Sequence, residues 1–103
     1  MILEVAILDV IEVKTQEFEQ IFNKAQKIIM SIDGYISHEL QKCIEQENRY
    51  ILLVKWQSLE DHTVGFRESS KYLEWKQLLH HFYNPFPIVQ HYEQIDSLSE
   101  SKV

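Results

Sequence analysis

Glycine and proline are scarce in this sequence: its 103 residues include 2 Gly and 2 Pro. Disordered low-complexity chains, collagen-like repeats and loop-dominated architectures need far more of both, so these classes are excluded. No apolar run approaches the roughly 20 residues that cross a bilayer. The first residues carry no basic region and no small-residue cleavage site, so a secretory signal is not expected. These absences favour one globular domain built from continuous helices and strands.

Positive charge is also in short supply. The chain has 10 Lys and Arg against 16 Asp and Glu, which gives a formal net charge of −6. Binding to nucleic acid or to an anionic membrane needs a surplus of positive charge, so we expect neither as a partner. The single cysteine, Cys43, cannot form an internal disulfide, and a chain without disulfides fits a reducing cytoplasm.

Sequence patterns that hold metals, nucleotides or nucleophiles are missing. His80 and His81 are adjacent, so on a helix they point about 100° apart and cannot chelate one ion together. With Gly34 and Gly65 as the only glycines, no glycine-rich phosphate loop exists. No nucleophile elbow is visible, and Cys43 is interpreted as a structural thiol. We therefore expect no metal site and no bound organic cofactor.

The strongest local pattern predicts a helix that begins near Thr15 and ends at Asp33-Gly34. Thr15 can serve as the N-cap, and Gly34 can adopt the positive φ that ends a helix or forms a turn. Between them, apolar residues recur at the spacing of one helix face. They are Phe18, Ile21, Phe22, Ala25, Ile28 and Ile29.

Two shorter helices are predicted in the second half of the chain. Ser58-Leu59-Glu60-Asp61 resembles a capping box with Asp in place of the usual Glu, and predicts a short helix through about Arg67. Another helix is capped by Ser69 or Ser70 and ended by Asn84-Pro85-Phe86-Pro87, because proline cannot continue a helix. Its buried stripe consists of Tyr72, Trp75, Leu78, Leu79 and Phe82.

Four segments have the composition of strands: 2–13, 35–45, 49–56 and 88–95. In the second of these, alternation places Ile36, His38 and Leu40 on one face and Tyr35 on the other. The short polar connection before Arg49 predicts a hairpin. Residues 97–103 form a polar tail that we expect to fray.

The order of these elements matches the ferredoxin-like βαββαβ plan, an α+β fold with an antiparallel four-stranded sheet and helices on one face. Residues 1–96 are expected to form the single domain. The first and third strands are apolar on both faces. The two sets are Leu3, Val5 and Ile7 against Ile2, Ala6 and Leu8 in the first strand, and Ile51 and Leu53 against Leu52, Val54 and Trp56 in the third. That is too much apolar surface to leave in water, so we expect a homodimer whose two sheets face each other.

Two histidines are candidates for acid–base chemistry. His62 lies in the first turn of the predicted short helix, where the helix dipole lowers its pKa and leaves a neutral imidazole that can accept a proton from a phenol. The alternative is a surface or capping histidine. His38 is either packed under a helix or a polar contact in a pocket between sheet and helices. Arg67 either holds a carboxylate or enolate oxygen, or pairs with a neighbouring glutamate on the surface.

Aromatic side chains supply candidate walls for a pocket. A stripe of aromatic residues at helical spacing is commonly core. So many rings in so small a domain also suit a flat substrate, because ligand pockets are mainly apolar and aromatic with a few polar groups. The expected substrate-binding residues are Trp56, Phe66, Trp75 and Tyr92.

Three stretches carry a family resemblance: Gly34-Tyr35-Ile36-Ser37-His38, the strand 50–56 followed by Ser58-Leu59-Glu60-Asp61-His62, and Ser69-Ser70-Lys71-Tyr72-Leu73-Glu74-Trp75. They resemble the antibiotic biosynthesis monooxygenase domain family, and the resemblance covers nearly the whole chain. It implies a dimeric α+β barrel. The family includes cofactor-free quinol and polyketide oxygenases, haem-degrading enzymes and members with no assigned activity.

The haem-degrading branch fits this sequence poorly. By resemblance, its iron-ligating histidine falls near Trp75 and its tryptophan near Gly65 or Phe66, and no histidine occupies the ligand position. His80 and His81 follow more than a turn later. A haem-degrading activity is therefore disfavoured.

The sequence thus predicts a cytoplasmic, cofactor-independent monooxygenase that acts with O₂ on a small aromatic substrate such as a quinol or polyphenol. His62 is the expected base and His38 a second polar contact. Two alternatives stay open: a non-catalytic small-molecule-binding or stress-response module of the same fold, and a small-molecule isomerase of the same barrel superfamily.

Overall fold

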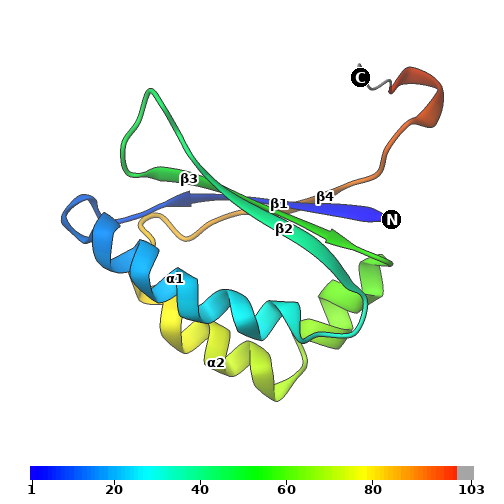
Figure 1. Ribbon diagram of the computed structural model, residues 1–103, viewed down its shortest axis with the longest axis horizontal. Coiled ribbons are helices and arrows are strands. Elements are labelled where there is room, and N and C mark those ends of the chain that lie inside the picture. Colours follow the sequence, from blue (N-terminus) through cyan, green and yellow to red (C-terminus); the bar gives the residue numbers. More distant parts are fainter. Residues whose placement is uncertain (100–103) are drawn as a thin grey trace.

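The computed structural model describes residues 1–99, and it has the predicted architecture: a four-stranded antiparallel sheet with both main helices on one face (Figure 1). In the sheet the strands lie in the order β2-β3-β1-β4. The strands are β1 (Ile2–Asp9), β2 (Tyr35–Lys42), β3 (Arg49–Trp56) and β4 (Val89–Tyr92), and the long helices are α1 (Thr15–Met30) and α2 (Ser70–Leu79). Short turns of helix are η1 (Glu12–Lys14), η2 (Asp61–Phe66), η3 (His80–Phe82) and η4 (Asp96–Leu98).

Most of the local sequence signals for the helices are confirmed. The N-cap predicted at Thr15 is wrong, because Thr15 is the first residue of α1 and no side chain caps this helix, which ends at Met30 before Asp33-Gly34. In α1 the buried residues are Phe18, Phe22, Ala25 and Ile29, all members of the predicted stripe. Ahead of η2, the Asp61 amide donates to the Ser58 hydroxyl over 3.2 Å, and the Ser58 amide donates to the Asp61 carboxylate over 3.1 Å. This reciprocal pair is the capping box. Ser69 caps α2, because its side chain accepts from the amide of Tyr72.

Three of the four strands are shorter than predicted. β1 ends at Asp9, and Val10 forms only an isolated bridge to Tyr83 before the chain turns into η1. β2 ends at Lys42, which leaves the half-buried Cys43 just beyond the strand. β4 has four residues. Of the predicted tail, η4 occupies the first part, and residues 100–103 lie outside the described residues.

The facing predicted for Tyr35 is wrong. A β-bulge between Tyr35 and Ser37 shifts the register against β3, so the strict alternation expected there fails. Tyr35 therefore shares the helix-covered face with His38, and Ile36 is exposed.

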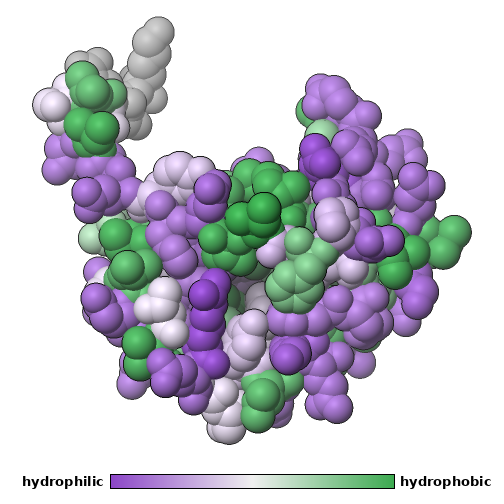
Figure 2. Space-filling model, turned by 180° about the vertical axis from the view of Figure 1, so that it is seen from behind, coloured by the Kyte–Doolittle hydropathy of each residue, from purple (hydrophilic) through white to green (hydrophobic). Residues whose placement is uncertain are grey.

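The core lies between the sheet and the helices. It includes Leu8, Val54 and Trp56 from the sheet and Phe18 and Leu79 from the helices. The other face of the sheet has no covering layer within residues 1–99, and it carries apolar side chains in neighbouring register positions: Leu3, Val5, Ile7, Ile51 and Leu53. Seen from behind, hydrophobic side chains gather in a hollow between the C-terminal segment and the projecting β2–β3 connection (Figure 2).

No helix among residues 1–99 combines the length and the apolar character that a membrane crossing requires.

Candidate active site

A cavity of about 360 Å³ lies between β1, β4 and the helical segments η2, α2 and η3. Its walls are mostly apolar or aromatic, including Phe66, Tyr72 and Trp75. Four polar or charged side chains also line it: Glu4, His62, Arg67 and His80. This is the composition of a small-molecule site at the lower end of the usual size range. A larger hollow of about 550 Å³ lies on the open sheet face beside Lys55 and Tyr92 and contains no histidine.

Glu4 is a carboxylate in the middle of the core-facing side of β1. It alternates with the buried Ala6 and Leu8, and its own side chain is 5% exposed. The indole N–H of Trp56 donates to Glu4 Oε1 over 2.9 Å, and His62 Nε2 lies 3.3 Å from the same oxygen. A buried carboxylate needs such partners, because an unpaired one would carry a large desolvation cost.

His62 is positioned by the wide turn η2. The Arg67 amide donates to the His62 carbonyl over 3.1 Å, an i→i+5 bond that places His62 and Phe66 on the buried side. The imidazole of His62 stacks on Trp56, with 5.3 Å between ring centroids and 22° between planes. Its Nδ1 lies 2.7 Å from Nε2 of His91, which reaches in from β4. Both ring nitrogens of His62 are thus engaged by protein groups.

The electrostatics of this cluster favour neutral forms. Burial lowers the pKa of His62 to about 3, and the charges of Arg67 and His91 act in the same direction. Burial raises the pKa of Glu4, against the opposing effects of the Trp56 hydrogen bond and the Arg67 charge. A buried ion pair is costly in this setting, and the neutral acid beside the neutral imidazole is its alternative. Burial also lowers the pKa of His91.

Arg67 is an exposed cation on the cavity wall. No carboxylate within residues 1–99 lies in salt-bridge distance of its guanidinium, so the surface pair with Glu60 or Glu68 does not form there. Its charge influences Glu4, His62 and His91 alike. It is placed to attract an anionic oxygen to the cavity.

The structure brings together three of the predicted site residues around His62. Phe66 and Trp75 line the cavity with His62, and their rings meet edge to face at 5.7 Å between centroids. Trp56 is fully buried behind the cavity and does not line it, but it contacts three residues that do: Glu4, His62 and Phe66. The structure therefore places Trp56 against the polar groups and outside the cavity wall.

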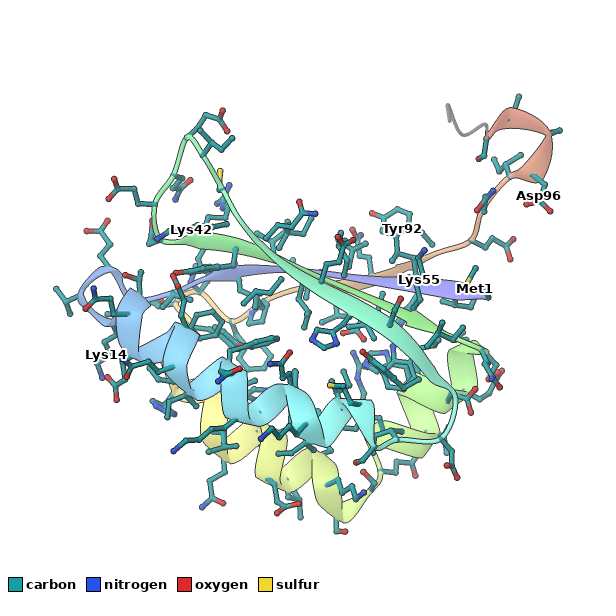
Figure 3. The ribbon with its side chains drawn as sticks, in the orientation of Figure 1. Met1, Lys14, Lys42, Lys55, Tyr92 and Asp96 are labelled. Carbon is teal, nitrogen blue, oxygen red and sulfur yellow. The ribbon has the colours of Figure 1, made fainter. Side chains whose placement is uncertain are left out.

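Two other predicted site residues lie elsewhere. His38 is on β2 under α1, and its ring nitrogens are bonded to the Tyr35 hydroxyl at 2.5 Å and to Gln26 Oε1 at 2.9 Å. Tyr92 pairs with Leu3 on the open face of the sheet, away from the helices (Figure 3). Residue parity explains the second difference, because His91 is the neighbour of Tyr92 that faces the cavity side.

Sequence reasoning missed Glu4, His91 and His80 as site residues. A signal existed for Glu4, since a carboxylate in phase with Ala6 and Leu8 breaks an otherwise apolar face. His91 is in phase with Val89 on β4. His80 lies among Tyr72, Tyr83 and Phe86, and its buried Nδ1 has no hydrogen-bond partner within residues 1–99.

The model of the antibiotic biosynthesis monooxygenase family matches residues 1–78, and the chain belongs to this family. The sequence-based recognition of the family is thereby confirmed.

Particular relatives extend this assignment over most of the chain. Bacillus subtilis (strain 168) YczJ, an uncharacterized protein, is 53% identical over 95 residues, which cover 92% of this chain and 100% of YczJ. A crystal structure from Bordetella bronchiseptica that carries the family name is 30% identical, with a TM-score of 0.87, and the match covers 91% of this chain and 96% of that one.

One similar structure bears the name of an activity. SnoaB from Streptomyces nogalater, described as a cofactor-independent oxygenase, matches with a TM-score of 0.80 at 16% identity, over 96% of this chain and 97% of SnoaB. At this identity the likeness establishes the shared fold.

Proposed function

We propose that this protein is a cofactor-independent monooxygenase that acts on a small, electron-rich aromatic substrate of the quinol or polyphenol class. The family assignment and the name of SnoaB support an oxygenase of this kind. The observation that carries the proposal is the buried Glu4–His62 pair at an aromatic-walled cavity of about 360 Å³. Such a cavity combines a proton acceptor with surfaces for a flat ring.

The chemistry needs little from the protein beyond these parts. Removal of a hydroxyl proton makes the ring electron-rich enough to transfer an electron to O₂, and the two radicals combine to a hydroperoxide. One oxygen atom stays on the ring and the other leaves as water. A quinol plus O₂ then gives a hydroxyquinone plus H₂O, so the substrate supplies all electrons. The protein binds the ring, accepts the proton and excludes bulk water.

The cavity residues take distinct roles in this proposal. Phe66, Trp75 and Tyr72 contact the flat ring. The Glu4–His62 pair as a unit accepts the hydroxyl proton, because the carboxyl group and the neutral imidazole are in contact and can share it. Arg67 stabilises the oxyanion that remains. Trp56 keeps Glu4 and His62 in place through its hydrogen bond and its stacking contact.

We further propose that the protein acts as a cytoplasmic homodimer that uses the open face of the sheet. The apolar register neighbours Val5 and Leu53, with Ile7 and Ile51 beside them, form the patch that a second copy would cover. A patch of this kind on both partners is self-complementary under a two-fold axis. The cavity lies on the opposite side of the sheet, so dimerisation leaves it open to substrate and O₂.

Oxygen uptake tests the catalytic proposal. Purified protein is mixed with naphthalene-1,4-diol, and the rate is compared with buffer autoxidation and with the variants His62→Gln and His81→Gln. His81 is exposed and does not line the cavity, so it is the matched control. We expect uptake above buffer, loss of about 10²-fold in His62→Gln and no change in His81→Gln.

Other outcomes separate the rival functions. Uptake equal to buffer across a panel of quinols, with measurable binding, would assign the cavity to a binding module. A Soret band on addition of haem would favour the haem-degrading branch. Solvent deuterium incorporation without oxygen uptake would favour an isomerase.

A further inference from the structure

Three titratable side chains in mutual contact form a row that begins at the cavity and ends near the protein surface. Glu4 Oε1 is 3.3 Å from His62 Nε2, and His62 Nδ1 is 2.7 Å from His91 Nε2. Glu4 and His62 line the cavity, whereas His91 does not. His91 is half-buried on β4, directly opposite Glu4 in the register of β1 and β4. We call this set the Glu4–His62–His91 row.

The geometry limits what His62 can do by itself. Both of its nitrogens already have partners, so a substrate hydroxyl has no free lone pair on this ring. Glu4 has one oxygen that is still available. Its Oε1 accepts the hydrogen bond from the Trp56 N–H and contacts His62, while its Oε2 makes no hydrogen bond within residues 1–99. Among residues 1–99, the buried polar atoms that lack a hydrogen-bond partner do not include Glu4 Oε2. This unbonded oxygen is therefore not fully buried. Glu4 Oε2 is therefore the acceptor that opens toward the cavity.

We infer that Glu4 takes the proton from the substrate and that His62 and His91 pass it to solvent. This inference rests on the proposed function and deepens it by assigning Glu4 as the group that contacts substrate and His91 as the exit. In this scheme His62 is an internal carrier, and His91 is a positioning and relay residue that never touches the substrate.

The proton balance closes over two states of the row. In the starting state from which the row reacts, Glu4 is ionised, His62 carries its proton on Nδ1 and donates it to His91 Nε2, and His91 carries its own proton on Nδ1. Glu4 accepts the substrate proton on Oε2, and rotation of the carboxyl group brings that proton to the lone pair of His62 Nε2. In the same transfer the Nδ1 proton of His62 moves to His91 Nε2, and the Nδ1 proton of His91 leaves to water. Glu4 is then again a carboxylate and both rings carry their proton on Nε2, so one proton has entered from the substrate and one has left. Return of both rings to their Nδ1 tautomers restores the start.

The surroundings suit proton transfer and argue against a metal centre. Arg67 is the fixed positive charge that acts on all three members of the row, and His80, Tyr72 and Tyr83 are the other titratable groups on the cavity wall. Within residues 1–99 no group of three His, Cys, Asp or Glu side chains converges to hold an ion. The nitrogens and oxygens of the row point at one another in sequence, which is the arrangement of a relay.

The kinetic test uses three variants, of which Glu4→Gln and His91→Gln keep the shape of the site. Glu4→Gln retains an acceptor for Trp56 and His62 but cannot take a proton, and His91→Gln retains a donor toward His62 Nδ1. His91→Ala opens space at the partly exposed end of the row. We expect kcat for naphthalene-1,4-diol oxidation to fall about 10²-fold in Glu4→Gln and about tenfold in both His91 variants, with KM unchanged. Added imidazole should restore the His91→Ala rate, while His91→Gln stays slow. Unchanged kcat in His91→Gln, or no rescue of His91→Ala, would overturn the inference.

A second measurement does not depend on turnover. The ¹⁵N shifts of the imidazole nitrogens report which nitrogen carries the proton in His62 and His91. We expect the two rings to change tautomer together in one titration, and Glu4→Gln to abolish that step. If the two rings titrate independently in the wild type, proton transfer along the row is refuted even if the protein oxidises quinols. If the titrations are coupled but the protein oxidises no quinol, proton transfer along the row is supported and the proposed function is refuted.

Discussion

Gly34 and Asp61 meet where the start of β2 lies against the start of η2, and they leave no room for a side chain at residue 34. Gly34 has φ of 89°, and a Cβ built there would overlap the carboxyl group of Asp61. The same carboxylate accepts hydrogen bonds from the Ser58 amide and hydroxyl. This glycine is therefore required by both its backbone angle and its neighbour, and the contact fixes the segment that carries His62.

Replacing Gly34 by alanine should destabilise the fold by about 2 kcal/mol or more, because positive φ is costly for alanine and Asp61 must move. Urea unfolding monitored by tryptophan fluorescence measures the change. Gly65→Ala is the matched control. A Cβ at Gly65 meets nothing nearer than the Glu60 carbonyl at 3.8 Å, so this variant should be neutral or slightly stabilising. Equal effects of the two substitutions would contradict the structure.

His62 should make the fold sensitive to acid. Its pKa is lowered to about 3 in the folded protein, so the unfolded chain binds the proton first as pH falls below about 6.5. The stability contributed by the neutral ring is present above that pH and is lost on acidification toward pH 3. Between pH 6.5 and 4.5 the loss should be about 2–3 kcal/mol.

The variant His62→Phe isolates this contribution, because it keeps a ring against Trp56 but cannot be protonated. Unfolding free energies of wild type and variant at pH 7 and 4.5 give the comparison. The variant should lose less stability over this interval. Parallel pH dependence in the two proteins would show that His62 does not titrate in this way.

His38 should behave as a structural residue. Its two hydrogen bonds, to Tyr35 and Gln26, lie under α1 and away from the cavity. His38→Ala should lower the free energy of unfolding by about 1–2 kcal/mol, since one or two part-buried hydrogen bonds are lost. It should leave kcat for the quinol probe unchanged. A large loss of kcat in a stably folded His38→Ala protein would return His38 to the catalytic site.

The open sheet face should control the oligomeric state. Leu53 pairs with Val5 at the centre of the apolar patch, and Leu53→Glu would place a charge there. Sedimentation should find twice the 12.4 kDa of one chain for the wild type and a single chain for the variant. The control Leu73→Glu changes a leucine of α2 that is 64% exposed, and this protein should stay dimeric. A monomeric wild type would remove the dimer proposal.

Local periodicity was sufficient to predict most of the fold. The spacing of Phe18, Phe22 and Ile29 determines which face of α1 is buried, and the order of elements restricts the topology to one familiar plan. The bulge at Tyr35 could not be predicted, because an extra residue in a strand has no fixed composition. Without the bulge, simple alternation assigns Tyr35 to the wrong face.

The site was predictable only in part, for a different reason. His62, Phe66 and Trp75 belong to neighbouring segments, so helical spacing brings them together. Glu4 and His91 are far apart in sequence and become neighbours because β4 pairs with β1 at the edge of the sheet. Each one looks like an ordinary polar residue in its own strand. Their pairing depends on long-range sheet order, which local patterns do not encode.

The position of β4 has a consequence for the timing of any reaction that uses the row. Among residues 1–99, β4 is an edge strand of four residues that pairs only with β1, so few backbone hydrogen bonds hold it in place. Short edge segments open locally at a much lower free energy than the global unfolding of a domain. Each such opening would carry His91 away from His62 and interrupt the path to water. Fraying of one strand end and the rate of proton release are thereby coupled, and hydrogen exchange at the amides of β4 would report on both.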